Sequence, residues 1–235
     1  LATKRVAATT VGTLTLDSYT RTGDLRAARR ALDQGIPLNG YPILTHDTAT
    51  TRGILDGVLD ADFPVQVRHG SATPQRIFAA LAEAGLHATE GGPVSYCLPY
   101  SRTSLERSLE NWREACDLLL SLRAADVEPH LETFGGCMLG QLCPPGLLVA
   151  LSVLEAIFFR QRGLRSVSLS YAQQAHRRQD EDAVLALRGL ARELLPGVDW
   201  HVVVYTYMGV YPRTPEGARL LATESARLAV RAGAA

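Results

Sequence analysis

Residues 145–170 read PGLLVALSVLEAIFFRQRGLRSVSLS, and this stretch contains the pattern that decides the fold. Pro145 suits the first turn of a helix, a long apolar run follows it, and Gly163 suits the left-handed residue that closes a helix. A short apolar and β-branched run comes directly afterwards, at 166–170. A helix that leads into a short strand, repeated along a chain, predicts an α/β protein with a parallel sheet.

The same alternation recurs along the whole chain, where seven βα units are visible. We expect strands at 11–16, 42–45, 64–68, 93–98, 127–133, 166–170 and 200–205. We expect helices at 25–34, 48–59, 74–84, 104–125, 145–162, 180–195 and 215–232. About seven units in tandem favour a (β/α)8 TIM-type barrel, with residues 1–235 forming a single catalytic domain or part of one. An open doubly wound sheet is the alternative, although no GxGxxG or GxxxxGK[ST] loop follows a strand.

Composition and charge limit the classes of partner. With 235 residues, 46% of them hydrophobic, the chain can bury a sizeable core. Its 24 basic residues equal its 24 acidic ones, so it lacks the basic footprint of a protein that binds nucleic acid or an anionic membrane. The cysteines are too few for a disulfide scaffold and form no CxxC pair, so we expect buried thiols, no metal site and a cytoplasmic protein; they are Cys97, Cys116, Cys137 and Cys143.

Polar residues follow several of the predicted strands, and in a barrel such residues meet at one face. Arg21 and Arg68 end different strands, and two guanidinium groups can clamp a carboxylate through bidentate forks. An ion pair with a neighbouring Asp or Glu explains each arginine equally well. His69 is a candidate general base, although a hydrogen-bonded histidine at a strand end is the more common case.

Further polar and aromatic residues surround the fourth predicted strand. Glu90, before two glycines, could hold a substrate ammonium or simply be solvated. Tyr96, Pro99 and Tyr100 could form the floor of a pocket, or only pack. Because no GxSxG, HExxH or nucleotide-binding loop is present, the residues by themselves indicate a pocket for a small anion and no particular reaction.

Short motifs stand in a fixed order along the chain. They are DSYTR at 17–21, LNGYP at 38–42, QVRHG at 66–70, EGGPVSYCLPY at 90–100, FG at 134–135, PP at 144–145 and MGVYP at 208–212. In order and spacing these motifs resemble the large (epsilon) subunit of glutamate mutase, also called methylaspartate mutase, a coenzyme B12-dependent carbon-skeleton isomerase.

The resemblance implies a TIM barrel that pairs as a homodimer and meets a small cobalamin-binding subunit, with adenosylcobalamin between the two. It implies radical interconversion of L-glutamate and L-threo-3-methylaspartate, or of a close amino-acid analogue, in which the cofactor supplies the radical. The cobalt-ligand motif DxHxxG of the small subunit is absent here. Carried over by motif, the catalytic residue is Glu90, the substrate contacts are Arg21, Arg68, His69, Glu90, Tyr96 and Tyr100, and the cofactor contacts are Asn39, Pro99 and Tyr211.

The chain also departs from the family pattern. No counterpart of the family's first strand precedes Leu1, and its late cofactor-binding segment would begin after Ala235. Cys97 replaces the usual Asn, Tyr211 the usual Phe, and Arg102 changes the local charge. We therefore expect either part of a longer chain or a shortened relative. A non-catalytic barrel that binds an amino-dicarboxylate or assembles with a partner is the alternative function, and a lyase that uses Glu90 or His69 as base is a third.

Overall fold

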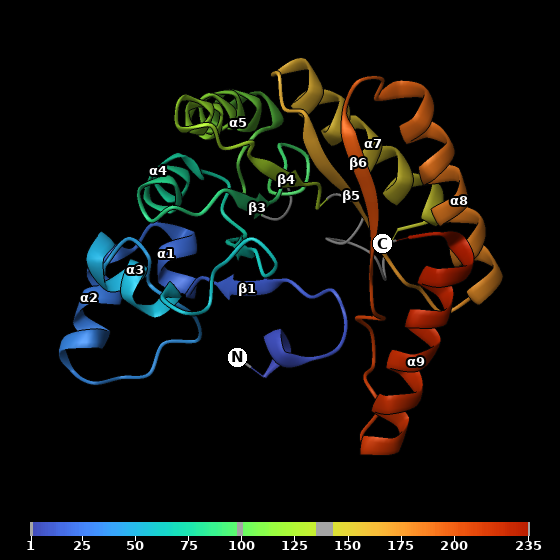
Figure 1. The fold of residues 1–235 in the computed structure, drawn as a ribbon, viewed down its shortest axis with the longest axis horizontal. Coiled ribbons are helices and arrows are strands. Elements are labelled where there is room, and N and C mark those ends of the chain that lie inside the picture. Colours follow the sequence, from blue (N-terminus) through green and yellow to red (C-terminus); the bar gives the residue numbers. More distant parts are fainter. Residues whose placement is uncertain (1, 98–100, 135–142, 235) are drawn as a thin grey trace. The chain divides into compact units, whose positions relative to one another are not determined.

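The computed structural model describes residues 2–97, 101–134 and 143–234 (Figure 1). Two compact units divide the chain. The first consists of Leu1–Glu90 and Tyr96–Pro129, and the second of Gly91–Ser95 and His130–Ala235. Each unit is an α/β assembly with its own parallel strands.

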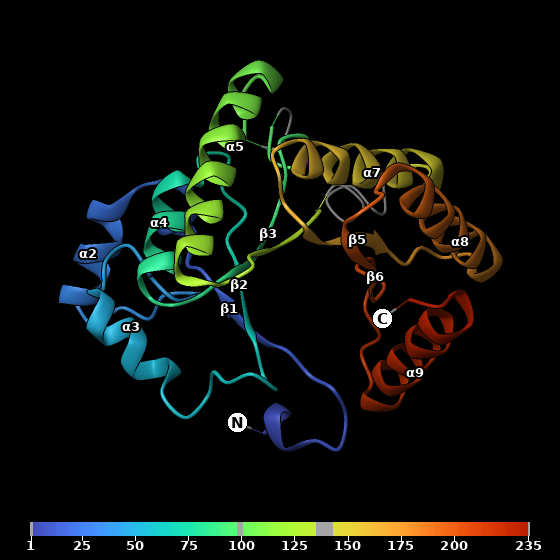
Figure 2. The ribbon, with the colours of Figure 1, turned by 45° about the horizontal axis from the view of Figure 1, so that its top comes forward.

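The first unit has three parallel strands in chain order, β1 (Gly12–Thr15), β2 (Val65–Arg68) and β3 (Ala88–Glu90). Thr15 pairs with Arg68, and Val67 with Thr89, so the carboxyl ends of all three strands meet at one edge. The helices are η1 (Thr3–Arg5), α1 (Ser18–Thr22), α2 (Leu25–Asp33), α3 (Thr48–Leu55), α4 (Gln75–Glu83), α5 (Leu105–Leu120) and η2 (Ser121–Ala125). Helix α4 packs against α5, and their buried side chains include Phe78 and Trp112 (Figure 2).

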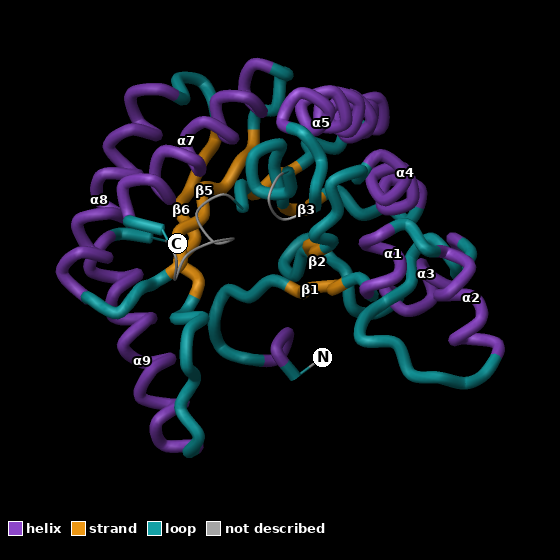
Figure 3. Tube along the Cα trace, turned by 180° about the vertical axis from the view of Figure 1, so that it is seen from behind, coloured by secondary structure: helices purple, strands orange, loops and turns teal. Residues whose placement is uncertain are grey.

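The second unit repeats this plan. Its parallel strands are β4 (His130–Glu132), β5 (Ser166–Ala172) and β6 (Asp199–Tyr205), again in chain order, and its described helices are α7 (Pro145–Gln161), α8 (Arg177–Leu194) and α9 (Pro215–Ala232). Helix α7 packs on β5 and against α8, and α8 also contacts α9 (Figure 3). The strands bury Leu131, Val167, Leu169 and Val202. The predicted α/β class with consecutive parallel strands is therefore confirmed.

Two of the predicted strands are wrong. At 42–45 the chain makes only an isolated bridge between Leu16 and Tyr41, because Pro42 has no N–H to donate to a strand ladder. The described part of the predicted strand at 93–98, residues 93–97, forms a turn, and β3 lies earlier, at Ala88–Glu90. The N–H groups of Val94 and Ser95 bond a side-chain carboxylate, that of Glu155, instead of a neighbouring strand.

Two helix starts also differ from the prediction. Helix α1 was not expected; the Asp17 carboxylate nucleates it by accepting from the N–H groups of Tyr19 and Thr20. Helix α8 begins at Arg177, capped by the ring of His176. Asp180, where the predicted helix 180–195 began, is instead buried inside α8. Within the described ranges, no helix is both long and apolar enough to cross a membrane.

Candidate functional site

The end of β1 is in close contact with the LNGYP motif at 38–42. The side-chain Oδ1 of Asn39 accepts a hydrogen bond from the N–H of Ser18 at 2.9 Å. A Cβ atom on Gly40 would lie 2.5 Å from the backbone carbon of Leu16, so only glycine permits this approach. The contact fixes the start of α1, which carries Arg21, and leaves Asn39 exposed with its amide NH2 available.

The end of β2 places His69 in a buried aromatic cluster. The ring lies 5.6 Å from Phe78, 5.7 Å from Tyr96 and 6.0 Å from Trp112, measured between centroids. Its Nδ1 accepts a hydrogen bond from the N–H of Ser71 at 2.9 Å, which assigns the ring proton to Nε2. Nε2 is buried, with no hydrogen-bond partner among the described residues.

The protonation state of His69 follows from its surroundings. Burial lowers its pKa to about 3, and the positive charge of Arg21 acts in the same direction. The ring is therefore neutral at neutral pH. With Nδ1 occupied by a backbone N–H and Nε2 protonated, it presents a hydrogen-bond donor and no free lone pair, which suits contact with an anionic substrate better than proton abstraction.

Acidification is expected to destabilise the protein through His69. As the pH falls below about 6.5, the unfolded imidazole binds a proton that the folded ring accepts only near its pKa of about 3. The contribution of His69 to the free energy of unfolding is thus fully present above pH 6.5 and lost below it, at about 1.4 kcal/mol per pH unit. Urea unfolding at pH 6, 5 and 4 should give a shallower pH dependence for His69→Asn, whose Oδ1 can still accept from Ser71. Equal slopes for parent and variant would contradict this account.

Glu90, at the end of β3, is 2% exposed and tied to its neighbours. Its Oε1 accepts from the N–H of His69 at 3.0 Å, and its Oε2 from the hydroxyl of Tyr96 at 2.5 Å. Burial raises the pKa of Glu90; the Tyr96 hydroxyl, the charge of Arg68 and two backbone N–H groups oppose that rise. Glu90 is therefore an acidic neighbour of Arg68, as expected if Arg68 forms an ion pair within the protein.

A cavity of about 630 Å³ opens beside these residues at the strand ends of the first unit. Its described lining consists of Ser18, Arg21, Thr22, Gly70, Ser71, Ala72, Thr73, Ser101, Arg102 and Thr103. These residues supply two guanidinium groups and several hydroxyls but no carboxylate. The cavity is therefore suited to a small anion.

The structure thus brings part of the predicted site together. Arg21 lines the cavity. Hydrogen bonds join His69, Glu90 and Tyr96, and the charge of Arg68 lowers the pKa of Glu90; none of these four residues is among the described lining. Asn39 stands at the end of β1. Tyr211 belongs to the second unit and is 52% exposed. Pro99 and Tyr100 lie outside the described residues.

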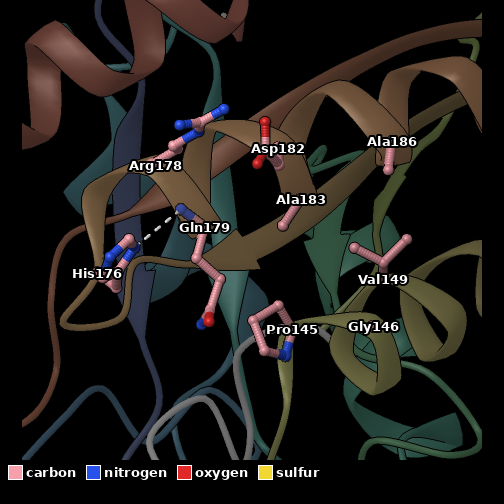
Figure 4. A pocket seen from close by; sticks show the side chains of 9 residues that line it. All are labelled: Pro145, Gly146, Val149, His176, Arg178, Gln179, Asp182, Ala183 and Ala186. Carbon is pink, nitrogen blue, oxygen red and sulfur yellow. Dashed lines mark hydrogen bonds between the residues drawn. The ribbon is translucent and has the colours of Figure 1, made fainter.

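A second cavity, of about 510 Å³, lies between α7 and α8 in the second unit (Figure 4). Its described lining consists of Pro145, Gly146, Val149, His176, Arg178, Gln179, Asp182, Ala183 and Ala186. None of these residues was predicted to bind a ligand. The lining carries one basic and one acidic side chain, so its charge favours neither anions nor cations.

Glu155, on α7, is a residue that sequence reasoning missed. It is completely buried, and its Oε1 accepts from the N–H of Val94 at 3.1 Å, the N–H of Ser95 at 2.7 Å and the hydroxyl of Ser95 at 2.5 Å. Its Oε2 accepts from the N–H of Phe134 at 3.2 Å. A Cβ on Gly92 would lie 2.1 Å from the Glu155 carboxyl carbon. The available signal was one acidic residue inside an otherwise apolar helical run.

The described residues contain no group of three or more His, Cys, Asp or Glu side chains placed to hold a metal ion. Among the described cysteines, Cys97 and Cys116 are buried and Cys143 is partly exposed. Cys137 lies outside the described residues.

Known proteins place this chain in a family. A model of the methylaspartate mutase E chain (MutE) family matches residues 2–235. The chain belongs to this family. Among curated MutE-family relatives, the glutamate mutase epsilon subunit of Halobacterium salinarum is 34% identical over 206 residues, which are 85% of this chain and 42% of that protein. The epsilon subunits of Yersinia enterocolitica and Escherichia coli O157:H7 are 31% and 28% identical over 94% of this chain and 47% of their own lengths.

The chain therefore spans less than half of the length of these three MutE-family relatives. Among solved structures, the HMG-CoA lyase of Brucella melitensis matches 75% of this chain and 59% of its own, with 15% identity and a TM-score of 0.44.

Proposed function

We propose that this chain is the substrate-binding part of the large subunit of an adenosylcobalamin-dependent isomerase. The reaction would interconvert L-glutamate and L-threo-3-methylaspartate, or a close amino-acid analogue. The proposal rests on the anion-binding cavity lined by Arg21, beside the buried group of His69, Glu90 and Tyr96. Membership of the MutE family and relatives named glutamate mutase epsilon subunit support it.

In this proposal each side chain has a defined role. Arg21 binds a substrate carboxylate through its guanidinium fork, and the neutral His69 ring donates from Nε2. Glu90 is the catalytic carboxylate and accepts from the substrate ammonium, whose charge favours the ionised form that burial alone disfavours. The Tyr96 hydroxyl orients Glu90, and Arg68 stabilises its negative charge. Tyr100 is a further proposed substrate contact.

The proposed cofactor contacts are Asn39, Pro99 and Tyr211. Two of them fit a large bound group: the exposed Asn39 amide has an NH2 that the Ser18 contact does not use, and Tyr211 lies in an exposed segment with Met208 and Val210. Bound adenosylcobalamin would supply a carbon radical by homolysis of its cobalt–carbon bond. The residues of this chain would hold the substrate in position and exclude water.

Assembly and location complete the proposal. We propose that the strands belong to a TIM-type barrel, which pairs as a homodimer and meets a small cobalamin-binding subunit. The epsilon-subunit names of the relatives support a multi-subunit enzyme. The buried cysteines Cys97 and Cys116 agree with a reducing, cytoplasmic location.

The test is turnover by the full protein with a small cobalamin-binding subunit and adenosylcobalamin. L-glutamate is supplied, and 3-methylaspartate is followed as mesaconate, by absorbance, with a coupling ammonia-lyase. Product that needs all three components is the expected result. Absence of product despite formation of the complex would contradict the proposal and favour the alternative, a barrel that binds an amino-dicarboxylate or a partner without turnover.

A further inference from the structure

Arg102 lies on the same cavity as Arg21 but comes from a different part of the chain. Arg21 belongs to α1, after β1, whereas Arg102 lies in the segment between Tyr96 and α5. Among the described residues neither arginine forms a salt bridge, and the described cavity lining contains no acidic side chain. The cavity therefore holds two positive groups that no described residue neutralises through a salt bridge.

The backbone at Arg102 is fixed rather than free. Its φ of 60° is left-handed, a conformation that residues other than glycine seldom adopt unless their surroundings impose it. The neighbouring Ser101 supplies those constraints: its N–H donates to the carbonyl of Cys97 at 3.0 Å and its hydroxyl to the carbonyl of Tyr96 at 2.5 Å. The N–H of Thr103 donates to the Ser101 hydroxyl at 3.3 Å.

The chain after Arg102 is anchored as well. Ser104 caps α5 by accepting from the N–H of Arg107 at 3.3 Å. Arg102 thus stands between a hydrogen-bonded turn that starts at Tyr96 and a capped helix. The backbone of Arg102 is therefore held in place beside the cavity, although its side chain is exposed to solvent.

We propose that Arg102 determines substrate specificity by binding the second carboxylate of an amino-dicarboxylate, while Arg21 binds the first. This inference rests on the proposed function. Two separate cations match two separate anionic groups, and the cavity of about 630 Å³ has room for a small amino acid with water. The hydroxyls of Ser71 and Thr73 supply further donors to a carboxylate. A ligand with a neutral amide in place of the second carboxylate would gain no electrostatic attraction from Arg102.

The test compares L-glutamate with L-glutamine, which has the same shape but one negative charge less. Calorimetric titration of the full protein measures the dissociation constant of each. Arg102→Ala should weaken L-glutamate binding about fivefold, as expected for a partly exposed charge pair, and change L-glutamine binding by less than about twofold. Arg102→Lys, which keeps the charge, should restore part of the loss. Arg76→Ala is the matched control, because Arg76 is an exposed arginine on α4 outside the described cavity lining.

The outcomes separate the two proposals. If Arg102→Ala leaves L-glutamate binding unchanged, or weakens both ligands equally, while Arg21→Ala still weakens L-glutamate binding, only the role of Arg102 is overturned. If the parent protein binds no L-glutamate, the substrate assignment and the role of Arg102 are both overturned.

Discussion

Glu155→Ala is expected to lower the free energy of unfolding by about 3–5 kcal/mol. The substitution removes the acceptor for the N–H groups of Val94, Ser95 and Phe134 and for the Ser95 hydroxyl. A buried donor left without a partner costs about 1–3 kcal/mol, and several donors lose theirs at once. Urea unfolding followed by circular dichroism measures the loss.

The controls for this experiment lie on the same helix. Leu154→Ala changes a side chain that is 57% exposed next to Glu155, so it should cost less than about 0.5 kcal/mol. Glu155→Gln keeps one acceptor oxygen but turns an NH2 towards a backbone N–H. Its free energy of unfolding should therefore lie between those of the parent protein and the alanine variant. If the free energy of unfolding of Glu155→Ala lies within about 1 kcal/mol of that of the parent protein, the hydrogen bonds to this carboxylate contribute little to stability.

Arg21→Ala is expected to weaken binding of L-glutamate by about 2–5 kcal/mol, which corresponds to at least a thirtyfold rise in the dissociation constant. Arg21 lines a cavity that has no described acidic side chain to replace the lost interaction with a carboxylate. Loss of its charge should also raise the pKa of the His69 ring, because Arg21 contributes to lowering it.

Calorimetry of the full protein measures the binding, and Arg26→Ala is the matched control. Arg26 is an exposed arginine of the neighbouring helix α2, outside the described lining of the cavity. If Arg21→Ala and Arg26→Ala bind L-glutamate equally well, Arg21 does not bind the substrate carboxylate.

Local chemistry explains which elements the sequence predicted. In β5 apolar residues alternate with serines, and β6 contains three consecutive valines. Pro145 and Gly163 mark the ends of α7 by their own backbone preferences. The stretch 93–98 misled the prediction because it has the composition of a strand. The N–H groups of Val94 and Ser95 donate to Glu155, which is 60 positions away from Ser95, and no local pattern reports such a contact.

The candidate site, like the fold, could be predicted from the sequence only in part. Family motifs identified Arg21, Glu90 and Tyr96, and the structure joins the latter two by a hydrogen bond. Arg102 and Glu155 could not be singled out as site residues, because the position of Arg102 depends on an unusual φ and that of Glu155 on non-local donors. The functional roles of all the predicted site residues, including Pro99, Tyr100 and Tyr211, remain predictions.

The path of the chain around Gly91–Ser95 limits how this protein can be divided. These five residues belong to the second unit, although the chain before and after them belongs to the first. A cut after Pro129 would leave Val94 and Ser95 on one fragment and Glu155, the carboxylate that they bond, on the other. Neither unit is therefore an independent module that recombination could transfer as one continuous stretch of gene. Fragments made at that point would have to be mixed before the N–H groups of Val94 and Ser95 could bond the Glu155 carboxylate.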